Sequence, residues 1–217
     1  MGAATRQQEV LEELRRQIRR IERRPARREG FLASGRSEVD ALLQGGGFPR
    51  GALSALSGGP ASGKTCVALS ALREAQADGA LAAFVDGRGE LYPPAARALG
   101  VDLARLLIVR PERGPSRGDP GARDAALPGL WAAEVLLASG AFVAVAIDVP
   151  LRDLPAARAE AMLRRLRSAA EKGGAAALLI EVPGGPAIPA VLRLDLDDAR
   201  LRPALRAVGD GEDGLGA

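Results

Sequence analysis

The chain has 217 residues, a net charge of +3 and a hydrophobic content of 47%, which suits one α/β domain with a short appendage. It contains no histidine, which excludes His-based catalytic triads and most zinc sites, and its single cysteine excludes an intrachain disulfide. A reducing cytoplasm is therefore the expected location. Met1–Gln8 holds no apolar signal core, and no apolar run is long enough to span a bilayer.

The N-terminal segment is basic, with nine arginines against five glutamates in residues 1–30. We expect a helix over residues 6–24, ended by Pro25, and a linker over 26–36. The apolar positions of this helix form one narrow stripe: Leu11, Leu14, Ile18 and Ile21. The stripe fits either the chain's own core or a partner protein. The charge fits either nucleic-acid contact or a solvated helix in an arginine-biased chain.

The most informative motif follows a short expected helix at Ser37–Leu43 and a glycine-rich turn at Gly45–Gly51. It fits the phosphate-binding pattern G-x-x-x-x-G-K-[ST] at every required position: Gly58, Gly59, Pro60, Ala61, Ser62, Gly63, Lys64 and Thr65. In such a P-loop the backbone N–H groups wrap a triphosphate, Lys64 reaches the terminal phosphates, and the Thr65 hydroxyl ligates Mg²⁺. The alternative is a Gly/Pro turn with a chance Lys-Thr pair.

The flanking segments favour the P-loop. Ala52–Leu56 is expected to be a buried strand entering the loop, and Cys66–Ala77 a helix leaving it, which is the order that a P-loop requires. Cys66, directly after the motif, joins the expected nucleotide-binding residues.

The rest of the chain alternates expected strands and helices. The strands are Leu81–Asp86, Leu106–Val109, Phe142–Ile147 and Ala175–Val182, and the helices are Pro94–Leu99, Ala125–Ser139 and Ala156–Lys172. Residues 111–123 are expected to form a loop, Val191–Leu196 and Leu201–Val208 an edge hairpin, and 209–217 a disordered acidic tail. Because the strands are apolar throughout, we predict a mostly parallel sheet with helices on both faces and a ligand at its carboxyl edge. Trp131 is expected to anchor the core.

Acidic residues at strand ends suggest the rest of a nucleotide site. Asp148 ends an apolar strand and is expected to hold Mg²⁺ together with Thr65, although an aspartate that caps the turn before Pro150 would have the same pattern. Hydrolysis needs a further carboxylate to activate water. The candidates are Asp86 and Glu90, and neither stands out from an ordinary solvated loop acid.

From Ser34 to about Leu196 the sequence resembles the ATPase core of bacterial RecA recombinase. Three groups of segments agree in order and spacing: residues 46–51 with 58–65, residues 84–86 with 95–102 and 106–107, and residues 142–148. The chain also resembles the ImuA family of RecA-like accessory proteins. That resemblance rests on the basic helix containing residues 14–18, the short linker, Val39–Leu43 and Gly45–Gly51.

The resemblance to ImuA implies a nucleotide-binding accessory role in SOS-induced translesion DNA synthesis, with ATP or ADP and magnesium as ligands. The implied partners are an ImuB-type polymerase-like protein and an error-prone replicative-type polymerase, with RecA as a further one. The resemblance implies no membrane contact. The domains are then the Arg-rich helix and linker (1–33), a RecA-like core (34–208) and the tail (209–217).

Departures from RecA affect the expected mechanism. The water-activating glutamate of RecA falls on Arg88, which stays protonated and cannot act as a base, so Glu90 is the replacement candidate. The γ-phosphate-sensing glutamine falls on Val182. The adenine-stacking tyrosine falls on Ala95, with Tyr92 near enough to replace it. ATP hydrolysis is therefore expected to be weak at most.

The DNA-binding loops of RecA are also reduced here. Only seven residues separate Asp148 from the helix that begins at Ala156, and the second loop has shrunk to Pro183–Ala187. Any DNA contact is expected to be weak and independent of sequence, through arginines on phosphates.

Two other functions stay open: a DNA-dependent ATPase, and a pure interaction protein with a vestigial P-loop, as in RecA-related cell-division inhibitors. The intact Gly63-Lys64-Thr65 argues against the latter.

Overall fold

The computed structural model describes residues 30–111, 126–181, 190–197 and 200–204. Its strands are β1 (Phe31–Leu32), β2 (Phe48–Pro49), β3 (Leu53–Gly58), β4 (Leu81–Asp86), β5 (Leu106–Val109), β6 (Phe142–Asp148), β7 (Ala176–Glu181), β8 (Leu192–Asp197) and β9 (Arg200–Ala204). Its α-helices are α2 (Ser37–Asp40), α3 (Lys64–Ala75), α4 (Pro93–Ala98), α5 (Leu127–Ser139) and α6 (Ala156–Gly173). Short 3₁₀ turns are η1 (Gln44–Gly46), η2 (Ala77–Gly79), η3 (Leu103–Arg105) and η5 (Leu151–Asp153).

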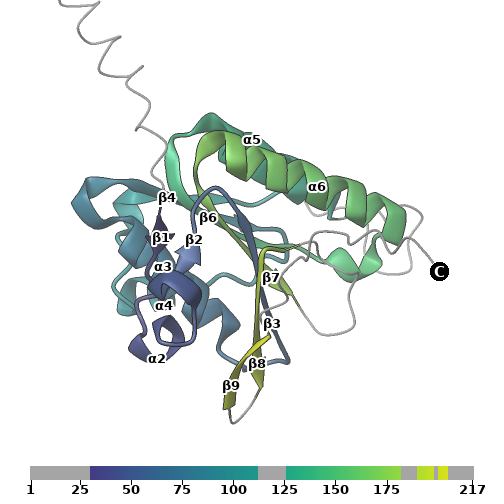
Figure 1. The fold of residues 1–217 in the computed structure, drawn as a ribbon. Coiled ribbons are helices and arrows are strands. Elements are labelled where there is room, and N and C mark those ends of the chain that lie inside the picture. Colours follow the sequence, from purple (N-terminus) through teal and green to yellow (C-terminus); the bar gives the residue numbers. More distant parts are fainter. Residues whose placement is uncertain (1–29, 112–125, 182–189, 198–199, 205–217) are drawn as a thin grey trace, which may run out of the picture.

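One large sheet organises this part of the chain (Figure 1). Within the described residues it has seven strands in the order β5-β4-β6-β7-β3-β8-β9, and all run parallel except β9, which pairs antiparallel with β8. β3, which leads into the P-loop, lies between β7 and β8. The predicted mostly parallel sheet and its edge hairpin, formed by β8 and β9, are confirmed. The described part of β9 ends at Ala204.

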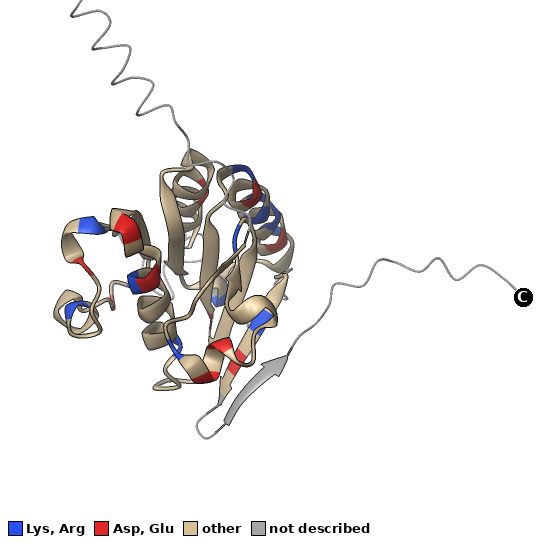
Figure 2. Cartoon of the chain, turned by 60° about the vertical axis from the view of Figure 1, so that its left-hand side comes forward, with Lys and Arg blue, Asp and Glu red and all other residues tan. Residues whose placement is uncertain are grey.

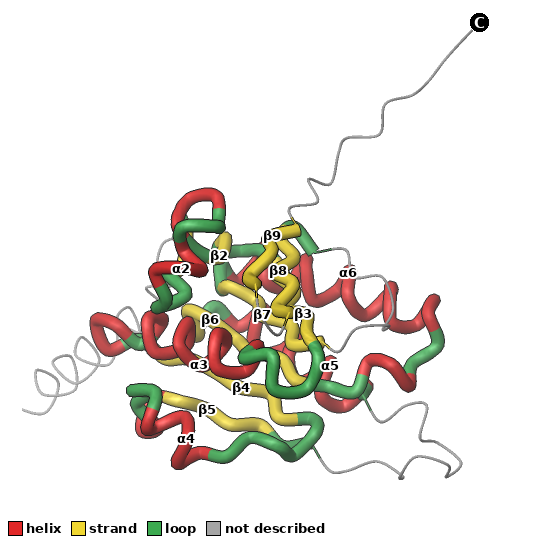
Figure 3. Tube along the Cα trace, turned by 90° about the horizontal axis from the view of Figure 1, so that it is seen from below, coloured by secondary structure: helices red, strands yellow, loops and turns green. Residues whose placement is uncertain are grey.

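Helices cover both faces of the sheet, with α3 on one side and α5 and α6 on the other (Figure 3). Alternation along each strand explains the two layers: in β4, Ala82 and Phe84 join the core beneath α3, whereas Ala83 and Val85 join the core beneath α5 and α6. Because both of their faces are covered, the central strands β4, β6 and β7 have continuous apolar sequences up to the acid that ends each of them. Most of the charged residues therefore belong to helices, loops and strand ends (Figure 2).

Two glycines end the long helices α5 and α6. Gly140 and Gly174 follow them in the left-handed conformation, with φ of 68° and 71°. Glycine adopts this conformation without the penalty that a Cβ imposes, so each helix stops where the next parallel strand must begin.

Several expectations fail in the described residues. The expected helix Ser37–Leu43 ends at Asp40, and the expected turn Gly45–Gly51 contains β2. Phe31–Leu32, placed in a linker, forms β1, because it pairs antiparallel with β2 and buries Leu32 in the core beneath α3. Trp131, expected in the core, is 62% exposed. α5 is apolar almost all round, with Glu134 as its one charged residue, so its sequence does not identify the buried face. Leu130, Ala133 and Leu137 are the residues that face inward.

Other predicted segments lie outside the described residues. These are the basic helix 6–24, most of the loop 111–123, the short loop Pro183–Ala187 and the acidic tail 209–217. Of the helices that are described, none combines the length and apolar character needed to cross a membrane.

Candidate functional site

The loop between β3 and α3 turns sharply at the carboxyl edge of the sheet. β3 ends at Gly58 and α3 begins at Lys64, and Gly63 between them is left-handed with φ of 85°. A Cβ on Gly58 would lie 2.6 Å from the carbonyl oxygen of Leu196 in β8, which is closer than real Cβ contacts. The order of strand, glycine loop and helix predicted from the sequence is thus observed. The close approach of β8 explains why the first residue of the loop is a glycine.

The loop is electropositive. The Lys64 Nζ folds back and donates to the Gly59 carbonyl oxygen at 2.8 Å, so the amine lies over the loop. The first turn of α3 contains no acidic residue, and its free N–H groups and positive helix end face the same loop. The Ser62 hydroxyl is buried and has no hydrogen-bond partner among the described residues. Such a set of donors suits a phosphate group.

Asp86, at the end of β4, holds the following loop in place. Its side chain is buried, and its Oδ1 accepts a hydrogen bond from the Glu90 backbone N–H at 2.9 Å. Its Oδ2 accepts from Arg110 Nε at 2.8 Å, and Arg110 also donates to the Leu91 carbonyl oxygen. The Leu91 backbone N–H lies 3.3 Å from both oxygens as well, so the carboxylate is fully engaged in holding the loop after β4.

Asp148, at the end of β6, lies next to Asp86 across the two strands. Its Oδ1 accepts a hydrogen bond from Arg88 Nε at 2.7 Å, and the Arg88 guanidinium also approaches the Val149 carbonyl oxygen at 3.4 Å. Burial raises the pKa of the Asp148 carboxyl, the Arg88 charge lowers it, and the nearby Glu90 and Asp86 carboxylates raise it further. The predicted metal ligand is therefore ion-paired with an arginine that follows β4.

A third acid–arginine pair lies beside the P-loop strand. Glu181 ends β7, and its Oε1 is 2.6 Å from a guanidinium nitrogen of Arg193 in β8. The same guanidinium donates to the Ser57 hydroxyl in β3 at 3.1 Å and to Asp195 at 3.0 Å, so Arg193 links three neighbouring strands. Burial raises the pKa of the Glu181 carboxyl, whereas the Arg193 charge and a hydrogen bond with Ser57 lower it.

The other predicted site residues lie at the margin of this edge. Glu90 is exposed, and its backbone N–H is bound to Asp86. Tyr92 precedes α4 and is 67% exposed. Cys66 and Thr65 are partly exposed in the first turn of α3. The structure thus brings Gly58–Thr65 together as one loop, while the roles of Glu90 and Tyr92 stay predictions.

Comparison with known proteins identifies the family. The model of the RecA N-terminal domain matches residues 15–160, which is more than half of the chain. The chain belongs to the RecA family. The RecA protein of Corynebacterium jeikeium is 41% identical over 117 residues, which is 54% of this chain and 28% of that protein. The RecA protein of Salinispora tropica is 36% identical over 143 residues, which is 66% of this chain and 38% of that protein.

The chain therefore spans less than two fifths of the length of these RecA relatives in their matched regions. Membership of the RecA family and the P-loop geometry together indicate a RecA-type nucleotide-binding fold. Nucleotide and magnesium binding are implied at the level of the family.

The described residues fit a magnesium ion poorly. Magnesium beside a nucleotide takes only one or two protein carboxylates, together with phosphate oxygens and waters, so the state of Asp148 decides the fit. Asp148, the acid that sequence reasoning assigned to magnesium with Thr65, already has an arginine on one oxygen. A divalent cation prefers free carboxylate and hydroxyl oxygens and is repelled by a neighbouring guanidinium.

Sequence reasoning missed the roles of Arg110, Arg193 and Glu181. Arg110 follows β5, and Arg193 occupies a polar position of β8, in which polar and apolar residues alternate. The available signal was an arginine in one strand and directly after another, next to strands that end in an acid. Their pairing depends on strand order, which joins residues far apart in the sequence, such as Asp86 with Arg110 and Ser57 with Arg193.

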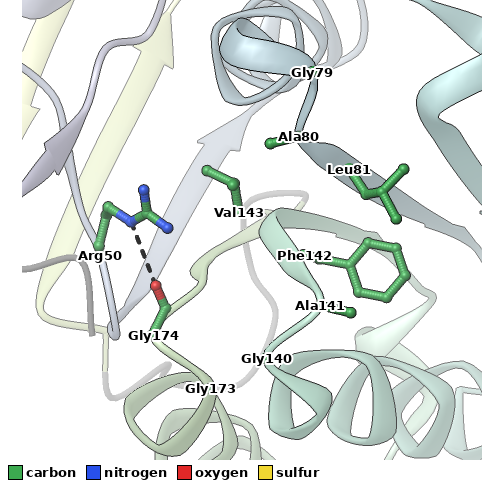
Figure 4. A pocket seen from close by; sticks show the side chains of 10 residues that line it. All are labelled: Arg50, Gly79, Ala80, Leu81, Gly140, Ala141, Phe142, Val143, Gly173 and Gly174. Carbon is green, nitrogen blue, oxygen red and sulfur yellow. Dashed lines mark hydrogen bonds between the residues drawn. The ribbon is translucent and has the colours of Figure 1, made fainter. Parts of the chain in front are cut away.

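A separate hollow lies at the opposite end of the strands (Figure 4). It is lined by Leu81 and Phe142, which begin β4 and β6, by Gly140 and Gly174 at the helix ends, and by Arg50. Arg50 Nε donates to the Gly174 carbonyl oxygen at 3.4 Å. Because strand starts and strand ends lie at opposite edges of a parallel sheet, this hollow is separate from the P-loop.

Proposed function

We propose that this chain is a RecA-like nucleotide-binding accessory protein that binds ATP or ADP and turns it over slowly or not at all. The observation that supports this most directly is the pairing of an intact P-loop with an arginine bound to Asp148. The loop supplies the lysine, the helix end and the unsatisfied Ser62 hydroxyl that a phosphate needs. The arginine stands where RecA is expected to have its water-activating glutamate.

Slow turnover is supported by the positions of the remaining acids. Asp86 accepts hydrogen bonds on both oxygens, and a general base needs a free lone pair within reach of the water. Glu90 is exposed on the loop after β4, so a nucleotide would have to draw that loop inward to use it.

The biological role that we propose is in SOS-induced translesion DNA synthesis, as in the ImuA family, in the cytoplasm. The partners would be an ImuB-type polymerase-like protein, an error-prone replicative-type polymerase and RecA itself. Support comes from RecA-family membership, from the seven-residue connection between Asp148 and α6, and from the basic N-terminal sequence. Direct DNA contact would be weak and would depend on charge.

One experiment tests this function. Nucleotide binding and phosphate release are measured on the full chain, with and without single-stranded DNA, for the wild type, Lys64→Ala and Glu90→Gln. We expect saturable binding that Lys64→Ala weakens strongly, and turnover far below the median of about 10 s⁻¹ for enzymes. Rapid DNA-stimulated turnover abolished by Glu90→Gln would instead show a DNA-dependent ATPase. Absence of binding in both wild type and Lys64→Ala would show a vestigial P-loop.

A further inference from the structure

The ion pair between Arg88 and Asp148 involves the residue that the sequence predicts as a metal ligand of the P-loop. The Arg88 side chain is 25% exposed and the Asp148 side chain 9% exposed, so the acid is buried while part of the guanidinium side chain stays accessible. Asp148 ends β6, and one strand, β7, separates β6 from the P-loop strand β3. Neighbouring strands lie about 4.8 Å apart, so Asp148 is about 10 Å from β3. A phosphate tail bound at the P-loop would therefore have to extend over the end of β7, where Glu181 lies, to reach Asp148.

Arg88 has the capacity to be that cation. A guanidinium has five N–H donors, and the described bonds to Asp148 and Val149 use two of them. Its fork geometry matches phosphate oxygens, and its positive charge persists at all physiological pH values. The bond to Asp148 fixes the guanidinium at the edge of the sheet before any ligand arrives.

The neighbouring arginines are held differently. Arg110 binds Asp86 and the Leu91 carbonyl oxygen, on the far side of β4 from the P-loop. Arg193 extends from β8 and is bound to Glu181, Ser57 and Asp195. Among these three, Arg88 is the one that pairs with the predicted metal ligand.

We propose that Arg88 replaces magnesium as the cation that faces the nucleotide phosphates, so that this P-loop binds ATP and ADP without a divalent metal. The inference deepens the proposed nucleotide binding and rests on it. Removal of the arginine charge exposes Asp148 to the phosphates. The carboxylate then repels the free nucleotide and becomes available to Mg²⁺, so that binding turns metal-dependent.

The test is a titration of the full chain with fluorescent ADP and ATP analogues, in buffer with magnesium chloride or with EDTA. For the wild type we expect dissociation constants that agree within about threefold in the two buffers. For Arg88→Gln we expect binding in EDTA to weaken about tenfold or more, with recovery in magnesium. Electron paramagnetic resonance of Mn²⁺ with ADP provides a direct check, since wild-type protein should leave the Mn²⁺–ADP spectrum unchanged.

Two further variants separate the role of Arg88 from the effects of an unpaired buried carboxylate and of losing an arginine elsewhere. The double change Arg88→Gln with Asp148→Asn avoids an unpaired buried carboxylate, and it should bind weakly but equally in both buffers. Arg105→Gln removes an arginine from an exposed ion pair with Asp102 and should behave like wild type. A wild type that binds in magnesium and loses about tenfold or more in EDTA overturns the role of Arg88 and leaves the proposed function standing. A wild type that binds in neither buffer overturns both.

Discussion

Asp86 and Asp148 lie side by side at the ends of β4 and β6, and each carboxylate is bound by an arginine at 2.7–2.8 Å. Two buried acids on adjacent strands would repel each other strongly if both were ionised and unpaired. Arg110 pairs with Asp86 and Arg88 pairs with Asp148, so each positive charge reduces the repulsion between the two carboxylates. Arg110 follows β5 and stabilises the loop after β4, whereas Arg88 belongs to that loop and reaches across to β6.

The two ion pairs give Asp86 and Asp148 different roles. Asp86 is committed to loop structure through bonds on both oxygens, which leaves Asp148 and its arginine as the part of this edge that can meet a ligand.

The first prediction concerns Asp86. Asp86→Asn removes the charge that binds Arg110 and weakens the acceptor for the Glu90 and Leu91 N–H groups. Because hydrogen bonds to charged groups contribute about 1.5–3 kcal/mol, we expect the free energy of unfolding to fall by about 2–3 kcal/mol. Urea denaturation measures the change. Asp102→Asn, in an exposed pair, should cost less than about 1 kcal/mol. Equal losses for the two variants would contradict the structural role of Asp86.

The second prediction compares two adjacent glycines of the P-loop. A Cβ on Gly58 would press against Leu196 and Ser62, whereas a Cβ on Gly59 would have no atom within 4 Å. We therefore expect Gly58→Ala to destabilise the protein by about 1–3 kcal/mol and Gly59→Ala to have almost no effect on stability. Thermal unfolding of both variants decides the matter, and a harmless Gly58→Ala would show that β8 does not lie against the loop.

Local sequence patterns were sufficient for most of this fold. The strand Leu81–Asp86 and the strand Leu106–Val109 have the predicted bounds, because short apolar runs between turn residues define such parallel strands well. β1 was missed because two residues carry no periodicity, and its pairing with β2 is set by the tertiary structure.

The candidate site was predictable only in part. The P-loop is a contiguous motif whose chemistry is local, so its residues were found directly. The partners of its acids come from distant segments: Arg193 reaches Ser57, which is 136 residues away in the sequence. Nothing in a single sequence fixes which of 30 basic residues meets which acid, because strand order makes that choice.

The third prediction uses neighbouring residues on α5. Leu130 is fully buried against the sheet, whereas Trp131 is 62% exposed. We expect Leu130→Ala to cost about 2–5 kcal/mol of unfolding free energy and Trp131→Ala to change it by less than about 1 kcal/mol. Chemical denaturation followed by circular dichroism gives both values, since the chain has a single tryptophan and fluorescence is lost in one variant. A large loss for Trp131→Ala would mean that this side chain packs against something in the folded chain.

The fourth prediction is a pH dependence at Glu181. Burial raises the pKa of this carboxyl in the folded state above its ordinary value of 4.5. The folded state then binds the proton more tightly than the unfolded state does. The contribution of Glu181 to stability is therefore fully present below pH 4.5 and is lost as the pH rises through the raised pKa.

Glu181→Gln replaces the titrating carboxyl with a neutral amide. The unfolding free energy of the variant should therefore fall less than that of the wild type between pH 4.5 and neutrality. Arg193 keeps Asp195 and Ser57 as partners in the variant, which limits other damage. Urea denaturation across the pH series measures both proteins, with Glu160→Gln on the exposed face of α6 as a matched change of charge. If the curves for Glu181→Gln and wild type stay parallel over this range, the Arg193 ion pair offsets the burial of Glu181 completely.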